Sequence, residues 1–193
     1  ARRLVENGTK TVLIRDIGWD HHRDVRRSLT YGFPGKYVQL DQAISALVDD
    51  LERRELSDKV LFVVASEFGR TPRLNPRGGR DHWLTNSCFL MGGKIRGGQA
   101  IGASSDVGMA PTPTNLETGA SDPGGEVIYP EHILRTLLVD AGPEADVADM
   151  RVEPIAALLR SENTQPTSSE PWRLWSTPSS PAVSVAGPLK SSW

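Results

Sequence analysis

The sequence predicts an α/β fold in which a mostly parallel sheet is flanked by helices. Two apolar runs, residues 11–17 and 60–65, have the length and composition of buried strands. Between them, residues 40–55 repeat apolar side chains at helical spacing and carry acidic and basic residues on the opposite face. A strand, a helix and a second strand in this order favour parallel pairing with a right-handed crossover.

The later elements follow from shorter apolar runs and from the glycines and prolines that interrupt them. Residues 86–91 are a third strand candidate, and residues 95–105 predict a tight turn and a short edge strand. Residues 106–125, rich in Gly, Pro, Thr and Ser, are typical of a surface loop. Pro130 is suited to the first turn of a helix that ends near Gly142, and His132, at the start of this helix, is expected on its surface.

The domain organisation is predicted as one partial domain with a tail. Residues 1–160 carry all of the predicted elements, and residues 161–193 are rich in Ser and Pro, which is typical of a disordered tail. The first eight residues have the composition of the last turns of a helix closed by Gly8. We therefore expect the chain to begin inside a larger protein.

Composition excludes several classes of function. A formal net charge of -2 argues against general binding of nucleic acid, which requires a basic surface. The single cysteine, Cys88, lies in an apolar run and is expected to be a small core residue. The sequence has no run of eighteen or more apolar residues, so no membrane span is predicted in it.

Acidic and imidazole side chains follow the ends of the two predicted strands. Asp20 and His22 come after the first strand and share a side of the chain if strand geometry persists, whereas His21 points away. Glu67 follows the second strand, and His82 comes fifteen positions later. A mixed set of carboxylates and imidazoles suits Zn, Mn or Fe better than Ca. The alternative is that the histidines are solvated and that Glu67 pairs with a nearby arginine.

The loop between the Glu67 and His82 positions is rich in arginine. Arg70 and Arg80 flank the candidate ligands, and their guanidinium groups suit a phosphate or sulfate anion. Arg73 and Arg77 lie farther along the loop, where a role in solubility explains them equally well.

Four sequence blocks in this order resemble a known family. The blocks are Gly18–His22, Leu40–Ala43, Ser66–Pro72 and Gly78–Trp83. Together they are similar to the C-terminal half of a sulfatase-like bacterial family catalogued as domain of unknown function 1501 (DUF1501), in the alkaline-phosphatase superfamily. The resemblance covers about residues 1–160 and implies an alkaline-phosphatase-like fold.

The resemblance also implies a metal-dependent hydrolase whose substrate is a small sulfate or phosphate ester or a sulfated glycan. Its expected cofactor is a divalent metal, Zn, Mn or Ca. Phe68 stands where the superfamily has a metal-ligating His. His21 remains an alternative to His22 as a metal ligand. The predicted metal ligands are Asp20, His22, Glu67, Asp81 and His82.

The superfamily's nucleophile belongs to an N-terminal half, and no residue of this chain is assigned that role. We therefore expect the chain to hold part of a site, with Arg70 and Arg80 stabilising anionic oxygens, and to be inactive alone. The alternative is a non-catalytic, sulfatase-like binding or structural module. The resemblance further implies a periplasmic or secreted protein.

Overall fold

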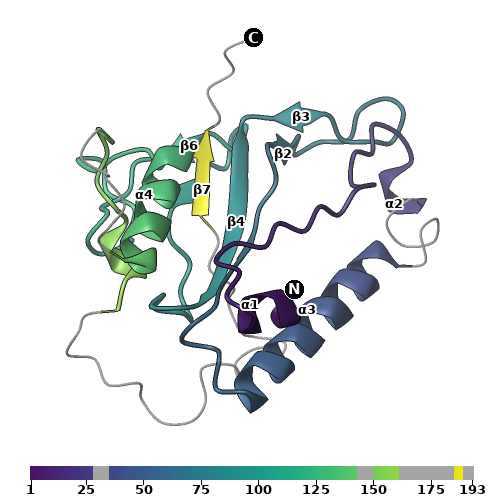
Figure 1. The fold of residues 1–193 in the computed structure, drawn as a ribbon. Coiled ribbons are helices and arrows are strands. Elements are labelled where there is room, and N and C mark those ends of the chain that lie inside the picture. The colour runs from purple at the N-terminus through teal and green to yellow at the C-terminus, as the bar shows by residue number, and fades with distance from the viewer. Residues whose placement is uncertain (28–34, 143–149, 161–184, 189–193) are drawn as a thin grey trace. The chain divides into compact units, whose positions relative to one another are not determined.

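The computed structural model describes residues 1–27, 35–142, 150–160 and 185–188. The chain divides into two compact units. The first unit comprises Ala1–Ser57 and Thr71–Asp81, and the second comprises Asp58–Arg70 and His82–Trp193. The helices α1, α2 and α3 belong to the first unit, whereas the described strands and α4 belong to the second (Figure 1).

The main element of the first unit is the helix α3, Lys36–Arg53, which confirms the helix predicted at residues 40–55. Its buried apolar residues, Ile44 and Leu51, lie seven positions apart and so on one face. The short helix α1, Arg2–Glu6, is tied to α3 by an ion pair between Arg2 Nε and Asp50 Oδ2 at 2.5 Å. A one-turn helix, α2 at Val25–Arg27, lies between them in the sequence.

The segment at residues 11–17 is irregular, so the first predicted strand is not formed. Its apolar side chains are exposed, Leu13 by 91% and Ile17 by 72%. The composition of this segment is that of a strand. A strand also needs a neighbouring strand to hydrogen-bond its backbone groups, and no such pairing of this segment is present among the described residues. The β-α-β unit predicted from this segment is therefore incomplete.

The largest sheet of the second unit has the strand order β1-β4-β7. The strands β1, Leu61–Val64, and β4, Thr85–Gly92, confirm two of the predicted strands. They pair antiparallel, with Leu61 opposite Gly92. The pairings among the described strands are all antiparallel, which differs from the parallel sheet that the sequence favours. A parallel, alkaline-phosphatase-like sheet stays a prediction.

The third strand of this sheet, β7 at Val185–Pro188, lies within the predicted disordered tail. It pairs antiparallel with β4, where Thr85 lies opposite Pro188. The rest of the predicted tail, residues 161–184 and 189–193, lies outside the described residues.

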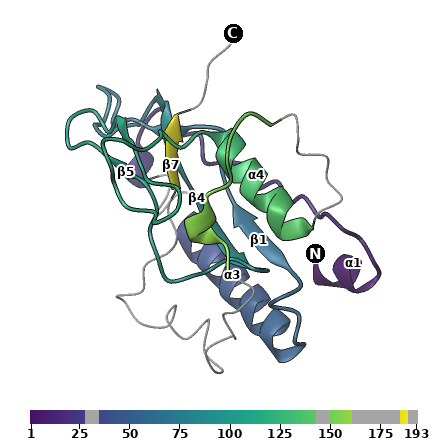
Figure 2. The same cartoon turned by 90° about the vertical axis from the view of Figure 1, so that its left-hand side faces the viewer.

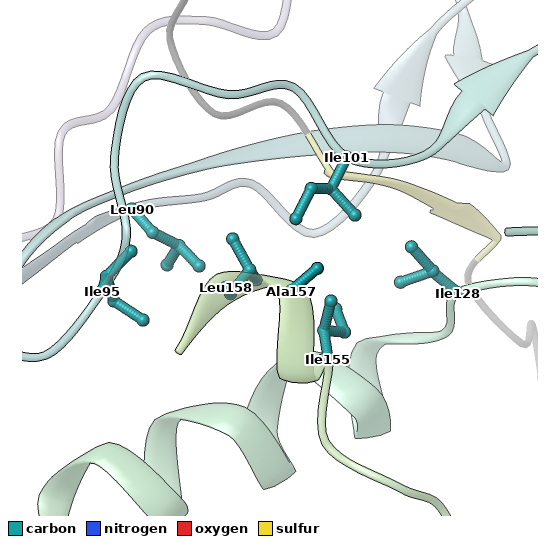
Figure 3. Packing of buried hydrophobic residues seen from close by; sticks show 7 residues of the cluster. All are labelled: Leu90, Ile95, Ile101, Ile128, Ile155, Ala157 and Leu158. Carbon is teal, nitrogen blue, oxygen red and sulfur yellow. The ribbon is translucent and has the colours of Figure 1, made fainter. Parts of the chain in front are cut away.

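The helix α4, Pro130–Ala141, begins and ends where the sequence predicts and lies alongside β1 and β4 (Figure 2). Its end is anchored because the backbone N–H of Lys94 donates to Asp140 Oδ1 at 2.6 Å. Ile133 and Leu137 of α4 pack against the core of the second unit. The buried members of that core come from β4, the loops after it and the short helix η2, Ala156–Leu158 (Figure 3): Leu90, Ile95, Ile101, Ile128, Ile155, Ala157 and Leu158.

Two small antiparallel pairs complete the second unit. The strands β2, Gly69–Arg70, and β3, His82–Trp83, form one pair, and β5, Ala103–Ser104, and β6, Pro111–Thr112, form the other. The segment at residues 106–125, predicted as a surface loop, thus contains a strand, and its Thr114 is fully buried. The backbone of Thr114 exchanges hydrogen bonds with Glu126, which is why this polar residue can be buried.

The cysteine prediction is confirmed, because Cys88 packs against the core from β4. Burial raises the pKa of its thiol to about 11, so the reactive thiolate is scarce near neutral pH. Among the described helices, none is long and apolar enough to cross a membrane.

Candidate functional site

Two loops of the first unit are held together by their backbones. The N–H groups of Asp24 and Val25 donate to the carbonyls of Arg77 and Gly78 at 3.1 and 3.0 Å. The N–H of Arg80 donates to His21 O at 3.0 Å. These bonds align residues 21–25 with residues 77–80, which are far apart in the sequence.

Gly79 permits this close approach. A Cβ atom at this position would lie 2.0 Å from the carbonyl carbon of His22 and 2.2 Å from Arg23 N. No side chain can be accommodated at such distances, so the two loops can adopt this pairing only with glycine here.

His22 lies between two carboxylates in this paired structure. Its Nδ1 is 2.7 Å from Asp81 Oδ1, and its Nε2 is 3.0 Å from Asp20 Oδ1. The side chains of His22, Asp20 and Asp81 keep 38%, 63% and 49% of their surface exposed, so a small ligand can reach them. The structure thus brings together three of the residues predicted as metal ligands, all within the first unit. These contacts come from His22, and the choice between His21 and His22 as a metal ligand stays a prediction.

Asp81, which was predicted as a metal ligand, contacts the ring of His22. Hydrogen bonds from His22 and then from Asn75 hold the pKa of the Asp81 carboxyl below its usual value, so it is a carboxylate near neutral pH. A carboxylate on the far nitrogen of a histidine orients that ring for metal binding in many metal sites. Oδ1 of Asp81 is therefore placed to orient His22, and its role as a direct metal ligand stays a prediction.

Asn75 was not among the residues predicted from the sequence. Its side chain donates to His22 O and to Asp81 Oδ1, both at 3.0 Å. The signal was the run Asn75-Pro76-Arg77-Gly78, which is typical of a turn opened by an Asx side chain. Such a pattern indicates the turn but not the contacts that its amide makes with another loop.

Arg80, predicted to stabilise an anion, donates from Nη1 to the carbonyls of Thr71 and Pro72, at 2.5 and 2.7 Å. Its guanidinium group thus fixes the ends of the loop that carries Asn75. A role in anion binding stays a prediction for this residue.

The other predicted site residues belong to the second unit. Glu67 is an exposed residue after β1. In the β2–β3 pair, Arg70 lies opposite His82, and the His82 ring stacks on Phe68 with 3.9 Å between centroids. The Arg70 guanidinium lies 5.3 Å from the centroid of the Phe68 ring.

His132 corrects another sequence-based expectation. Predicted on the surface of α4, it is only 1% exposed. Its Nδ1 accepts a hydrogen bond from Tyr129 N at 3.0 Å, which caps the first turn of the helix. The ring is therefore explained by helix capping and burial.

Asp16, four residues before the candidate ligands begin, is bound to a buried lysine. Lys36 Nζ donates to Asp16 Oδ1 at 2.5 Å, and Trp19 Nε1 donates to Asp16 Oδ2 at 2.7 Å. These two hydrogen bonds hold the pKa of the Asp16 carboxyl below its ordinary 3.8.

The depressed pKa of Asp16 predicts a dependence of stability on pH. A carboxyl whose pKa is lower in the folded state stabilises the fold above its unfolded pKa, and this contribution is lost as pH falls through the folded value. We expect stability to decline below about pH 4, with a smaller decline in Asp16→Asn. Urea unfolding of both proteins between pH 2.5 and 6 measures the difference. Equal pH profiles would contradict the assignment of Asp16.

Comparison with known proteins identifies a family for most of the chain. The model of the family described as "Protein of unknown function (DUF1501)" matches residues 1–118. No curated protein and no solved structure matches the chain. The matched residues include both loops of the His22 site and the strands β1 to β4. The chain therefore belongs to the DUF1501 family.

Proposed function

We propose that this chain supplies a divalent-metal site of a sulfatase-like or phosphatase-like ester hydrolase, with Asp20 and His22 as ligands. The observation that supports it most is the position of His22 between two carboxylates. A neutral imidazole has one N–H and can donate to only one of them. In the shorter contact, of 2.7 Å, Nδ1 carries the proton and donates it to Asp81 Oδ1. Nε2 and Asp20 Oδ1 are then two hydrogen-bond acceptors that lie 3.0 Å apart.

Two hydrogen-bond acceptors this close to each other repel. A divalent cation bound by both of them would remove this repulsion. Nitrogen and carboxylate donors together suit Zn or Mn better than Ca, which prefers oxygen ligands. A second proton on the ring would also satisfy both carboxylates, so a metal titration is needed to separate the two explanations. His82, which follows Asp81 in the chain, and Glu67 are the further ligands that the sequence predicts.

The charge around the paired loops supports an anionic substrate. Residues 20–27 and 71–81 contain six arginines and three aspartates, without lysine or glutamate, in a chain whose net charge is -2. Arg73 and Arg77 are exposed. Guanidinium groups donate two parallel hydrogen bonds to sulfate or phosphate oxygens, so this loop pair is suited to a sulfate or phosphate ester, including a sulfated glycan.

The bound metal would supply Lewis-acid polarisation of an ester oxygen. The chain's own residues have simpler tasks: His22 and Asp20 hold the ion, Asp81 holds the imidazole, and the arginines bind and orient the anion. No residue of this chain is assigned as nucleophile, so we expect anion binding without turnover. The family resemblance adds export to the periplasm or the medium as part of this proposal.

A non-catalytic binding module is the second candidate. It is favoured by Phe68, which stands at the position of a family ligand and covers one face of His82. Metal-dependent hydrolysis after the chain is joined to the N-terminal half that the resemblance implies would separate the two candidates.

The test is a titration of sulfate and of phosphate into the chain with and without Zn²⁺ or Mn²⁺, followed by an assay with 4-nitrophenyl sulfate and 4-nitrophenyl phosphate. We expect anion binding that requires the metal and is lost in Asp20→Asn. Asp106→Asn, which removes the same charge from an exposed position in the second unit, should bind like wild type.

Two results would contradict parts of this proposal. Anion binding that persists after complete removal of metal would favour an arginine scaffold that captures anions without a metal. Hydrolysis by this chain that is lost in Asp20→Asn would show that a nucleophile lies within it and that the expectation of binding alone is wrong.

A further inference from the structure

The side chain of Asn75 uses all of its hydrogen-bonding capacity in the paired loops. Its amide nitrogen donates to His22 O and Asp81 Oδ1 at 3.0 Å each. Its Oδ1 accepts from the N–H groups of Arg77 and Gly79, also at 3.0 Å each. The two backbone donors fix which end of the amide is oxygen, because a rotated amide would place its NH₂ group against them.

This geometry connects the backbone of His22 to the carboxylate that contacts its ring. One planar NH₂ group bridges His22 O and Asp81 Oδ1, so their separation is set by a rigid group. Thr71 fixes the backbone of Asp81, since Asp81 N donates to Thr71 Oγ1 at 3.1 Å. Asp81 is thus held both at its backbone N–H and at its carboxylate oxygen Oδ1.

The pairing of the two loops does not depend on the Asn75 amide nitrogen. Backbone hydrogen bonds from Asp24, Val25 and Arg80 join the loops independently. The turn at Asn75 also has its own backbone bonds, from Gly78 N to Asn75 O at 2.9 Å and from Asn75 N to Gly79 O at 2.8 Å. The amide nitrogen of Asn75 instead fixes the position of Asp81 relative to His22.

We propose that Asn75 is a positioning residue that selects the tautomer of His22. By holding Asp81 Oδ1 against Nδ1, it places the ring proton on Nδ1 and leaves the Nε2 lone pair directed to Asp20. That is the nitrogen which the proposed metal site requires, so the consequence for metal affinity rests on the proposed function. The tautomer itself is a property of the metal-free chain.

Asn75→Asp is the sharpest variant. An aspartate keeps the oxygen that accepts from Arg77 and Gly79, and so keeps the turn, but it replaces the donor with a carboxylate oxygen close to Asp81. Like charges at this distance repel, which moves Asp81 away from the ring. The matched control is Asn115→Asp in the second unit, where Asn115 Oδ1 also accepts two backbone N–H groups, from Glu117 and Thr118.

The experiment records the ring ¹⁵N shifts of the metal-free full chain at a pH at which the His22 ring carries a single proton, with the His22 signals assigned by their loss in His22→Gln. We expect protonated Nδ1 and unprotonated Nε2 in wild type and in Asn115→Asp, and a mixture of tautomers in Asn75→Asp. Backbone amide signals of Arg77 and Gly79 report that the turn is retained. Zinc affinity is expected to fall about 10–100-fold in Asn75→Asp, as for other residues that orient a ligand.

Unchanged ring shifts in Asn75→Asp, with the turn retained, would overturn the positioning role. Loss of the wild-type tautomer in Asn115→Asp as well would overturn it too, since the effect would then be nonspecific. A shifted tautomer in a chain whose wild type binds no zinc would support the positioning role and contradict the proposed function, so the two failures are distinguishable.

Discussion

Replacing Leu158 by alanine is expected to lower the free energy of unfolding by about 2–5 kcal/mol. Leu158 has 0% of its surface exposed and lies in η2, among the apolar side chains that join β4 to the segment after α4 (Figure 3). Removing its buried methyl groups loses their transfer free energy and leaves a cavity. The neighbours of Leu158 are themselves buried, so the cavity can collapse only in part.

Urea unfolding followed by circular dichroism measures this loss. Leu134→Ala is the matched control, because Leu134 lies on α4 with 51% of its surface exposed and alanine is favourable in a helix. We expect the control to change stability by less than about 1 kcal/mol. Equal effects of the two substitutions would contradict the assignment of the core.

Replacing Gly79 by alanine is expected to reduce metal affinity about 100-fold or more, because the geometry of a metal site tolerates little displacement. The added Cβ would lie 2.0 Å from the His22 carbonyl carbon, so the loops must separate by more than an ångström. His22 then moves away from Asp81, and the ring loses its orientation. The clash involves backbone atoms, which cannot rotate out of the way.

Isothermal titration with Zn²⁺ measures the affinity of Gly79→Ala. Gly97→Ala is its control, since a Cβ at Gly97 meets no atom within 4 Å. We expect the control to bind metal like wild type. Normal zinc affinity in Gly79→Ala would show that the close pairing of the two loops is not needed for the site.

The helices α3 and α4 and two strands were predictable because their signals are local. The spacing of Ile44 and Leu51 determines the buried face of α3, and Pro130 and Gly142 mark the ends of α4. Strand pairing is not local, and the apolar run of β1 does not determine whether its partner is parallel or antiparallel. The segment at residues 11–17 illustrates this, since its composition is typical of a strand but it is irregular in the structure.

The sequence predicts which residues form the candidate site better than it predicts what each of them contacts there. Asp20 and His22 were predicted because they follow an apolar run, and Asp81 was predicted through the family resemblance. Which atom contacts which depends on the approach of two loops about fifty residues apart in the sequence, which only the folded chain determines. Asn75 was missed for this reason, and His132 was placed on the surface because its capping contact was not foreseen.

Elemental analysis of the purified chain shows directly whether Asp20 and His22 hold a divalent metal. The measurement compares wild type with His22→Ala and with Asp106→Asn as the control outside the site. We expect about one equivalent of transition metal in wild type and in the control, as in a single mononuclear site, and none in His22→Ala. A wild type that takes up no Zn or Mn, or a His22→Ala variant that retains the wild-type amount, would contradict it.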